Sequence, residues 1–138
     1  MHSIGELSKK AGVKVPTIRY YEQMGLISAP ERTGGNQRRY TTGDLERLTF
    51  IRHARDLGFP IDAIRQLISL AGHPHSPCAE ADEIAAAQLS EVREKIARLR
   101  TLEQELQRIV GHCDGDHAIE DCYVIRALSD HGLCAGEH

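Results

Sequence analysis

The chain lacks any long run of apolar residues. No stretch of its 138 residues approaches the roughly 18–20 consecutive apolar residues that span a bilayer. Its first segment, MHSIGELSKK, also lacks the apolar core of a secretory signal peptide. We therefore expect a cytoplasmic protein with no membrane partner. The chain is also short for an elaborate enzyme, and no general-base arrangement can be identified in it.

Helix breakers are missing from one long segment in the second half of the chain. Between Ala79 and Gly111 there is no proline and no internal glycine, which predicts one long helix. Apolar residues recur there in steps of three and four, the spacing of a coiled-coil seam with one irregular step near Glu103. They are Leu89, Val92, Ile96, Leu99, Leu102, Leu106 and Ile109. Such a stripe must pack on a partner, so we predict a homodimer. Packing against its own domain is the alternative, but the short N-terminal helices offer little surface.

Charge is distributed unevenly along the sequence. Residues 1–60 carry ten Lys/Arg against six Asp/Glu, a net charge of +4, whereas residues 61–138 carry seven against fourteen, a net charge of −7. A basic front half favours an anionic partner. All four cysteines and six of the eight histidines lie in the acidic half. In a reducing cytoplasm, clustered cysteines indicate metal or redox chemistry rather than structural disulfides.

The basic half predicts short helices and a hairpin. Ser3 and Glu6 form an S-x-x-E capping box for a first helix that ends at Gly12. A second helix begins near Pro16, because proline is favoured in a first turn, and the pair makes a helix-turn-helix candidate. The turn formers Pro30, Gly34, Gly35 and Asn36 then predict a hairpin. Further helices are expected at about 43–57 (capped by Thr42), 61–70 and 122–130.

Two segments carry a family resemblance. IGELSKKAGVKVPTIRYYEQMGLI and RTGGNQRRYTTGDLERLTFIRHARDLGF resemble the winged-helix DNA-binding domain of the MerR family of bacterial transcription regulators, over about residues 3–71. The long helix and the cysteine-bearing end resemble the metal-sensing branch of that family, which includes divalent zinc, lead, cadmium and mercury sensors. Gln37 departs from the pattern, because the wing usually has an aromatic residue there.

The elements and the resemblance together predict a mainly α fold with three parts. Residues 1–72 would form a winged helix-turn-helix DNA-binding domain. Residues 73–111 would form a linker and a long antiparallel coiled-coil dimerisation helix. Residues 112–138 would form a metal-binding loop, a short helix and a tail.

The resemblance implies that the second helix lies in the major groove of promoter DNA and that the hairpin wing contacts the backbone. Arginine can bond phosphate or read guanine, and tyrosine and threonine hydroxyls bond phosphate oxygens. Simple solvation of a surface is the alternative for these side chains, whereas Ile18 and Leu26 are expected in the core. Carried over by position, the candidate DNA-binding residues are Thr17, Arg19, Tyr20, Arg32, Arg38, Arg39 and Tyr40.

The segment HCDGDHAIEDC, residues 112–122, concentrates metal-binding side chains. It has no aromatic residue and no large apolar residue except Ile119, so it cannot bury itself. A bound ion would supply the missing cohesion. The candidate ligands are Cys113, Cys122 and His117, and less surely His112, Asp114 or Asp116; Cys134 is a weaker candidate. The alternative is a polar loop with unrelated cysteines.

The spacing between Cys78 and the other cysteines indicates a site that two chains share. Cys78 lies 35 residues before Cys113, and a helix of that length would separate the two by roughly 50 Å. Thiolates that share one ion lie within about 4 Å of each other, because metal–sulfur bonds are near 2.3 Å. In an antiparallel dimer, however, Cys78 from the partner subunit would meet Cys113 and Cys122, which gives two equivalent sites.

Sulfur with imidazole suits zinc, cadmium, lead or mercury and does not suit magnesium or calcium. In the resembling family, a cysteine at the start of the long helix marks sensors of divalent ions, and Cys78 fills that position. The histidines favour zinc, since a mercury site needs only thiolates. We therefore expect a divalent metal ion, with zinc favoured, as the bound cofactor.

These features predict a metal-responsive transcription regulator rather than an enzyme. The resemblance implies that it activates a metal resistance or efflux promoter by distorting DNA so that RNA polymerase can engage. A thiol redox sensor that joins Cys113 to Cys122 is the main alternative. A small zinc enzyme is less favoured, and so is an iron–sulfur sensor, because no tight four-cysteine run is present.

Overall fold

The computed structural model describes residues 1–28, 31–32, 38–112, 115–116 and 118–130 of the chain. It contains two compact units, residues 1–85 and residues 86–138. Among the described residues, none of the helices combines the length and the hydropathy that a bilayer span requires.

The first unit begins with α1 (Ile4–Ala11). The Ser3 hydroxyl accepts a hydrogen bond from the amide of Glu6, and the Glu6 carboxylate accepts one from the amide of Ser3. The predicted capping box is therefore confirmed, and these bonds lower the pKa of Glu6. α1 ends at Gly12, whose φ of 69° favours glycine.

The turn after α1 leads into α2 (Val15–Gln23), which carries Pro16 in its first turn as predicted. Ile18 and Tyr21 are its buried residues. Gly12 also allows α3 to approach, because a Cβ at that position would lie 2.2 Å from Nη1 of Arg52. That arginine donates a hydrogen bond of 3.0 Å to the carbonyl oxygen of Ala11, which fixes the end of α1 on α3.

The wing is a short antiparallel hairpin. β1 (Glu31–Arg32) pairs with β2 (Arg38–Arg39), so the hairpin predicted from the turn formers is present. An isolated bridge joins His2 to Tyr40 through two backbone hydrogen bonds of 2.7 Å, which ties the base of the wing to the N-terminus.

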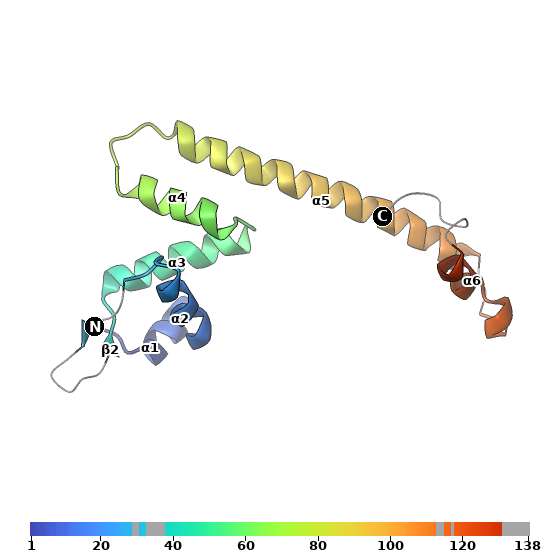
Figure 1. Ribbon diagram of the computed structural model, residues 1–138, viewed down its shortest axis with the longest axis horizontal. Coiled ribbons are helices and arrows are strands. Elements are labelled where there is room, and N and C mark those ends of the chain that lie inside the picture. Colours follow the sequence, from blue (N-terminus) through green and yellow to red (C-terminus); the bar gives the residue numbers. More distant parts are fainter. Residues whose placement is uncertain (29–30, 33–37, 113–114, 117, 131–138) are drawn as a thin grey trace. The chain divides into compact units, whose positions relative to one another are not determined.

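Two further helices complete the first unit. α3 (Thr42–Asp56) is capped by Thr41, which forms a capping box with Asp44; the prediction that Thr42 caps this helix was wrong by one residue. α4 (Ile61–Ala71) follows after a turn. Figure 1 shows α1 and α2 on one side of α3 and α4 on the other. The largest fully buried side chains of this core are Tyr40, Leu7, Ile18, Leu48, Ile51 and Ile64.

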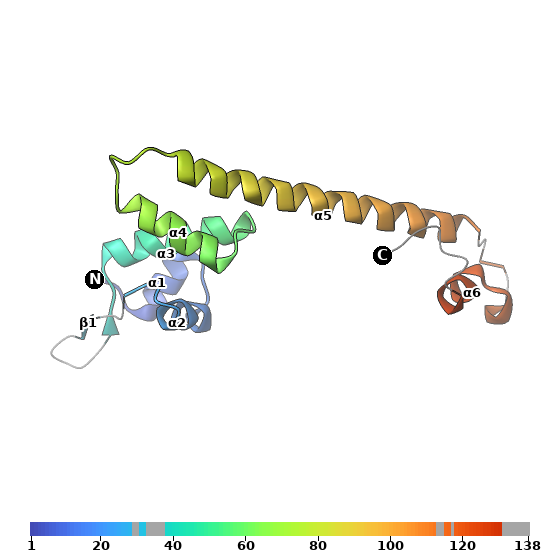
Figure 2. The ribbon, with the colours of Figure 1, turned by 45° about the horizontal axis from the view of Figure 1, so that its top comes forward.

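The long helix α5 (Ala79–Gly111) has the bounds that the absence of breakers predicted. Its first turns belong to the first unit, where Ile84 packs against the core. In the second unit, a 3-10 turn η1 (Ile119–Asp121) leads to α6 (Tyr123–Ser129), which lies near the C-terminal end of α5 in Figure 2.

Two faces of α5 differ within the second unit. Ile109 is buried, as is Ala127 on α6, whereas the rest of the predicted seam is exposed. The exposed residues are Leu89, Val92, Ile96, Leu99, Leu102 and Leu106, and Val110 at 67% exposure extends them. At the C-terminal end of α5, the exposed stripe therefore continues through Val110 rather than through Ile109. Four members of this stripe, Leu99, Leu102, Leu106 and Val110, line a groove together with Glu103, Gln107 and Gly111.

Candidate DNA interface and metal site

The recognition helix α2 separates core from surface in the way that the sequence predicts. Ile18 is fully buried, and so is Leu26 just after the helix, which confirms their expected place in the core. Arg19 and Tyr20 are exposed, and Thr17 is half-buried on the same helix. The Tyr20 ring, 47% exposed, is tilted against that of Tyr21, with their centroids 5.9 Å apart. Three polar side chains are thus available on one helix for phosphates or base edges.

Not all basic residues of the first unit are free for DNA. Arg47 donates to the carbonyl oxygen of Leu26 at 3.4 Å, and Arg55 donates to that of Phe59 at 3.0 Å. Arg52 bonds to the end of α1 and pairs with Asp56 at 3.8 Å. These arginines of α3 hold turns together. The other lysines and arginines of the first unit lie on or next to α1, α2 and the wing, except Arg65 on α4; they are Lys9, Lys10, Lys14, Arg19, Arg32, Arg38, Arg39 and Arg65.

The wing brings two predicted DNA-binding residues into register. Arg32 pairs directly with Arg38 across the hairpin. Arg39 forms an ion pair with Glu6 at 3.7 Å, so it also links the wing to α1.

Tyr40 is a correction to the predicted DNA-binding set. Its side chain is fully buried, and its hydroxyl donates a short hydrogen bond to the carboxylate of Glu22 on α2. A side chain without exposed surface cannot contact DNA. Tyr40 instead joins the base of the wing to the recognition helix, and this long-range packing has no signal in the local sequence.

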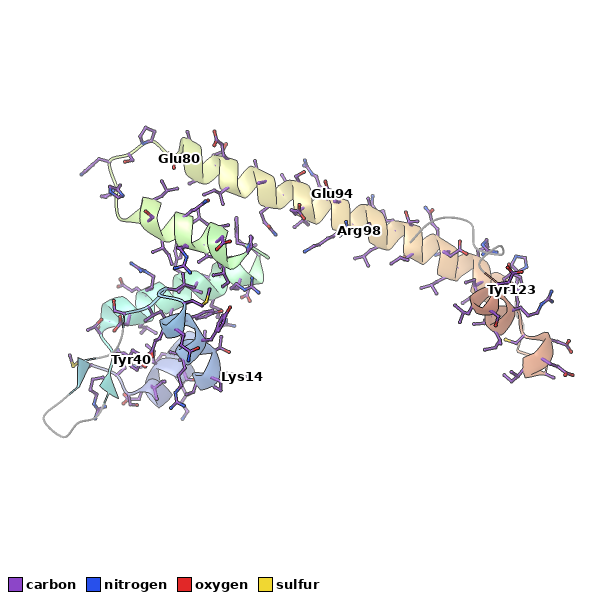
Figure 3. All side chains as sticks on the ribbon, viewed as in Figure 1. Lys14, Tyr40, Glu80, Glu94, Arg98 and Tyr123 are labelled. Atoms are coloured by element: carbon purple, nitrogen blue, oxygen red, sulfur yellow. The ribbon has the colours of Figure 1, made fainter. Side chains whose placement is uncertain are left out.

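Lys14 is a candidate that the sequence reasoning missed. It is exposed and takes the N-cap position of α2, where no side chain caps the helix. Figure 3 labels its side chain at the start of that helix. A cation beside the amide groups of a helix N-terminus suits a phosphate. A lysine two residues before the proline in the first turn of this helix is the signal that could have found it.

Cys78 lies at the start of α5. Its carbonyl oxygen accepts a hydrogen bond of 2.9 Å from the amide of Asp82, and the residue is exposed. Cys122 is half-buried and lies at the other end, as the N-cap residue of α6. Neither forms a disulfide among the described residues. The 33 residues of α5 rise by about 50 Å, which is the length predicted for the helix between Cys78 and Cys113.

The other predicted metal ligands divide between described and undescribed positions. Cys113, Asp114, His117 and Cys134 lie outside the described residues, so their assignment stays a prediction. Within the described part of the chain, no three His, Cys, Asp or Glu side chains come together as a metal cluster.

His112 is described, and its ring packs on Tyr123. The ring centroids lie 4.4 Å apart with an interplanar angle of 32°. Arg108 donates to the Tyr123 hydroxyl and pairs with the carboxylate of Glu105, which is 9% exposed. These partners, Glu105 first, raise the pKa of Arg108. The two residues that flank the segment 113–122, His112 and Tyr123, are therefore held next to each other at the end of α5.

The donor chemistry fits a soft or borderline divalent ion. Cys78 and Cys122 supply thiols, and Cys113 and His117 would add a third thiol and an imidazole. Sulfur and nitrogen donors of this kind form tetrahedral zinc sites and bind the heavier divalent ions. A dimer that contributes donors from both chains would complete such a site.

Comparison with known proteins shows the family of the chain. Residues 2–70 match the family model described as MerR HTH family regulatory protein, and residues 45–109 match the model described as MerR, DNA binding. The HTH-type transcriptional regulator ZntR of Escherichia coli K12 is 44% identical over 130 residues, which are 93% of this chain and 92% of that protein.

Two solved structures are also similar. The transcription regulator PbrR691 from Ralstonia metallidurans CH34, in complex with lead(II), has a TM-score of 0.78 and 40% identity, over 93% of this chain and 99% of that one. The dual-function regulator MerR from Bacillus megaterium MB1, in complex with mercury(II), has a TM-score of 0.70 and 28% identity, over 94% of this chain and 100% of that one. The chain therefore belongs to the MerR family of helix-turn-helix transcription regulators.

Proposed function

We propose that this MerR-family regulator is a homodimer that binds promoter DNA and responds to a divalent soft or borderline metal ion. Its α2 helix and wing hold the DNA, its α5 helix forms the dimer, and the cysteines around α5 hold the ion. It acts in the cytoplasm on a metal resistance or efflux promoter, together with RNA polymerase. The observation that carries the proposal is the placement of Cys78 and Cys122 at opposite ends of one 33-residue helix.

Zinc is the favoured ion, and cadmium, lead or mercury are the alternatives. The relatives in complex with lead(II) and mercury(II) support a divalent ion of this class. His117 supports zinc, because imidazole is a common zinc ligand whereas mercury needs only thiolates. When bound, the ion would join Cys113, Cys122 and His117 of one chain to Cys78 of the partner subunit.

The proposed response is a shift between two conformations of the DNA-bound dimer. In the activating conformation, the two DNA-binding domains bend and untwist the promoter spacer so that RNA polymerase can engage. The relative positions of the metal ligands from the two chains must differ between the two conformations, so that the ion binds one conformation more tightly. Only such a difference in affinity can shift the equilibrium. Each tenfold difference in affinity shifts it by about 1.4 kcal/mol.

A heterodimer of two complementary variants tests the shared site. One chain carries Cys78→Ser, and the other carries Cys113→Ser with Cys122→Ser. If the sites are shared, one site of the heterodimer is doubly altered and the other is intact. Zinc titration of the purified heterodimer should then show one high-affinity site, about half of the wild-type stoichiometry. Both variant homodimers should bind weakly, because water replaces a thiolate poorly.

The two outcomes are distinct. If each site were built within one chain, the heterodimer would contain no complete site and would bind no zinc tightly. That result, with the dimer intact by sedimentation, would overturn the antiparallel arrangement. Transcription from the target promoter with zinc, cadmium, lead, mercury and copper(I) would then identify the inducing ion. Metal-free protein with a Cys113–Cys122 disulfide after anaerobic purification would support the redox alternative instead.

A further inference from the structure

Tyr123 occupies a special place in the second unit. It is the first residue of α6 and follows Cys122 directly. Its ring contacts two residues at the end of α5, with His112 at 4.4 Å between ring centroids and the Arg108 guanidinium carbon at 5.8 Å from its centroid. Figure 3 labels Tyr123 beside the end of α5.

The arginine in this arrangement is itself held in place. Arg108 pairs with Glu105 through two hydrogen bonds, and it donates a third to the Tyr123 hydroxyl. Glu105 is 9% exposed and is the buried charged residue among those described. Such an acid needs its cation nearby, because removing one partner of a buried pair is costly. Arg108 therefore has one preferred position, and Tyr123 is oriented by it.

The two stacked residues, His112 and Tyr123, flank the proposed metal-binding segment 113–122 in the sequence. His112 precedes Cys113, and Tyr123 follows Cys122. A ring contact between His112 and Tyr123 brings together the two residues that flank the ten-residue segment 113–122 and reduces the entropy that metal binding must otherwise remove. Buried Ile109 and Ala127 hold α6 at the same helix end.

We propose that Tyr123, in contact with both Arg108 and His112, is the positioning residue of the metal site, and that His112 serves the site by stacking rather than by ligation. This inference rests on the proposed metal-binding function. It assigns the imidazole of the ligand set to His117, and it makes Arg108, Tyr123 and His112 one unit that connects the site to the dimerisation helix.

Substitutions of Tyr123 test the positioning role in the full-length dimer. Zinc affinity is measured anaerobically in competition with a chelator. Tyr123→Ala removes the stack and should weaken zinc binding by about tenfold, which is the lower end of the range for residues that orient metal ligands. Tyr123→Phe keeps the stack, loses only the hydroxyl contact with Arg108, and should retain most of the affinity. Leu128→Ala, at a 73% exposed position on the same helix, is the matched control and should bind zinc as the wild type does.

Substitutions of His112 separate stacking from ligation. A phenylalanine can stack on Tyr123 but cannot bind a metal, whereas an alanine can do neither. We expect His112→Phe to bind zinc as the wild type does, and His112→Ala to bind it more weakly. Cobalt(II) in place of zinc gives a second readout, because its visible spectrum reports the ligand set. The spectrum of His112→Phe should match that of the wild type.

Opposite results would overturn the inference. If His112→Phe loses as much affinity as His112→Ala and changes the cobalt spectrum, His112 is a ligand. If Tyr123→Ala binds zinc as tightly as the wild type, the stack does not position the site. Other results would contradict the metal-binding proposal itself. The wild type would then not bind zinc, cadmium, lead or mercury tightly, or the Cys113→Ser, Cys122→Ser variant would bind them as the wild type does. Promoter affinity without metal should stay unchanged in all these variants.

Discussion

The two units of the chain differ in how much of their apolar surface they bury. Thirteen buried apolar residues form the core of the first unit, whereas Ile109 and Ala127 are the buried apolar residues of the second among those described. Leu99 and Val110, both more than 60% exposed, show what the second unit leaves uncovered. We therefore expect the first unit to fold by itself and the second to need a partner helix and a bound ion to complete it.

The largest expected effect comes from removing the thiols of the second unit. In the double variant Cys113→Ser, Cys122→Ser, metal-dependent transcription should be lost, since serine does not replace thiolate toward a soft ion. Dimerisation and promoter affinity should remain close to those of the wild type, because neither residue lies on the exposed stripe or on the basic surface. Transcription assays and DNA-binding titrations on the same preparation measure both. A variant that no longer dimerises or binds DNA would show that the site is structural instead.

Replacing an isoleucine with alanine should destabilise the protein in different ways in the two units. Ile51→Ala removes a fully buried side chain of the first unit and should lower the free energy of unfolding by about 2–5 kcal/mol. That loss should not depend on protein concentration. Ile96→Ala removes a side chain that is 42% exposed in one chain, so its cost should arise through the dimer.

Thermal unfolding over a range of protein concentrations distinguishes the two variants. The melting temperature of the Ile96→Ala protein should rise with concentration more steeply than that of the wild type, while the Ile51→Ala protein should be lower throughout the range. Concentration-independent destabilisation by Ile96→Ala would mean that the stripe packs within its own chain, which was the alternative to dimerisation.

A smaller effect, on DNA affinity, is expected from a basic residue of the first unit. Arg38→Ala should weaken binding to all DNA sequences and lower the slope of log affinity against log salt by about one, because one phosphate contact is lost. Arg126→Ala, an exposed arginine of α6 in the second unit, is the matched control and should leave the slope unchanged. Equal slopes for Arg38→Ala and the wild type would exclude a phosphate contact by this wing residue.

Local signals in the sequence were sufficient for most of the fold. The bounds of α5 follow from the absence of proline and internal glycine, and the cap of α1 follows from Ser3 and Glu6. The cap of α3 was misplaced by one residue because two adjacent threonines can both serve, and the Asp44 partner selects Thr41. In such cases the deciding interaction lies within one helical turn.

Contacts between distant residues were not visible in the sequence. The hydroxyl of Tyr40 meets Glu22, 18 residues away, and this buries a residue that its place on the wing suggested was exposed. The ring of Tyr123 meets His112 across the metal segment. Family resemblance located the sites, but the role of each side chain within them depends on packing that no periodic pattern encodes.

The smallest expected effect concerns the exposed stripe itself. With Ile109 buried inside its own unit, a regular alternation of four- and three-residue steps runs through Leu99, Glu103, Leu106 and Val110, and these residues line one groove. Glu103 thus takes a core position of the dimer, where a polar residue fixes register at a cost in stability. Glu103→Leu should tighten the dimer by roughly 1–2 kcal/mol, because each buried methylene contributes about 0.8 kcal/mol. Ser90→Leu, at an exposed position on the opposite side of α5, is the control and should leave dimer affinity unchanged. Sedimentation at nanomolar concentration measures both, and a dimer weakened by Glu103→Leu would place the carboxylate in a favourable ion pair across the interface.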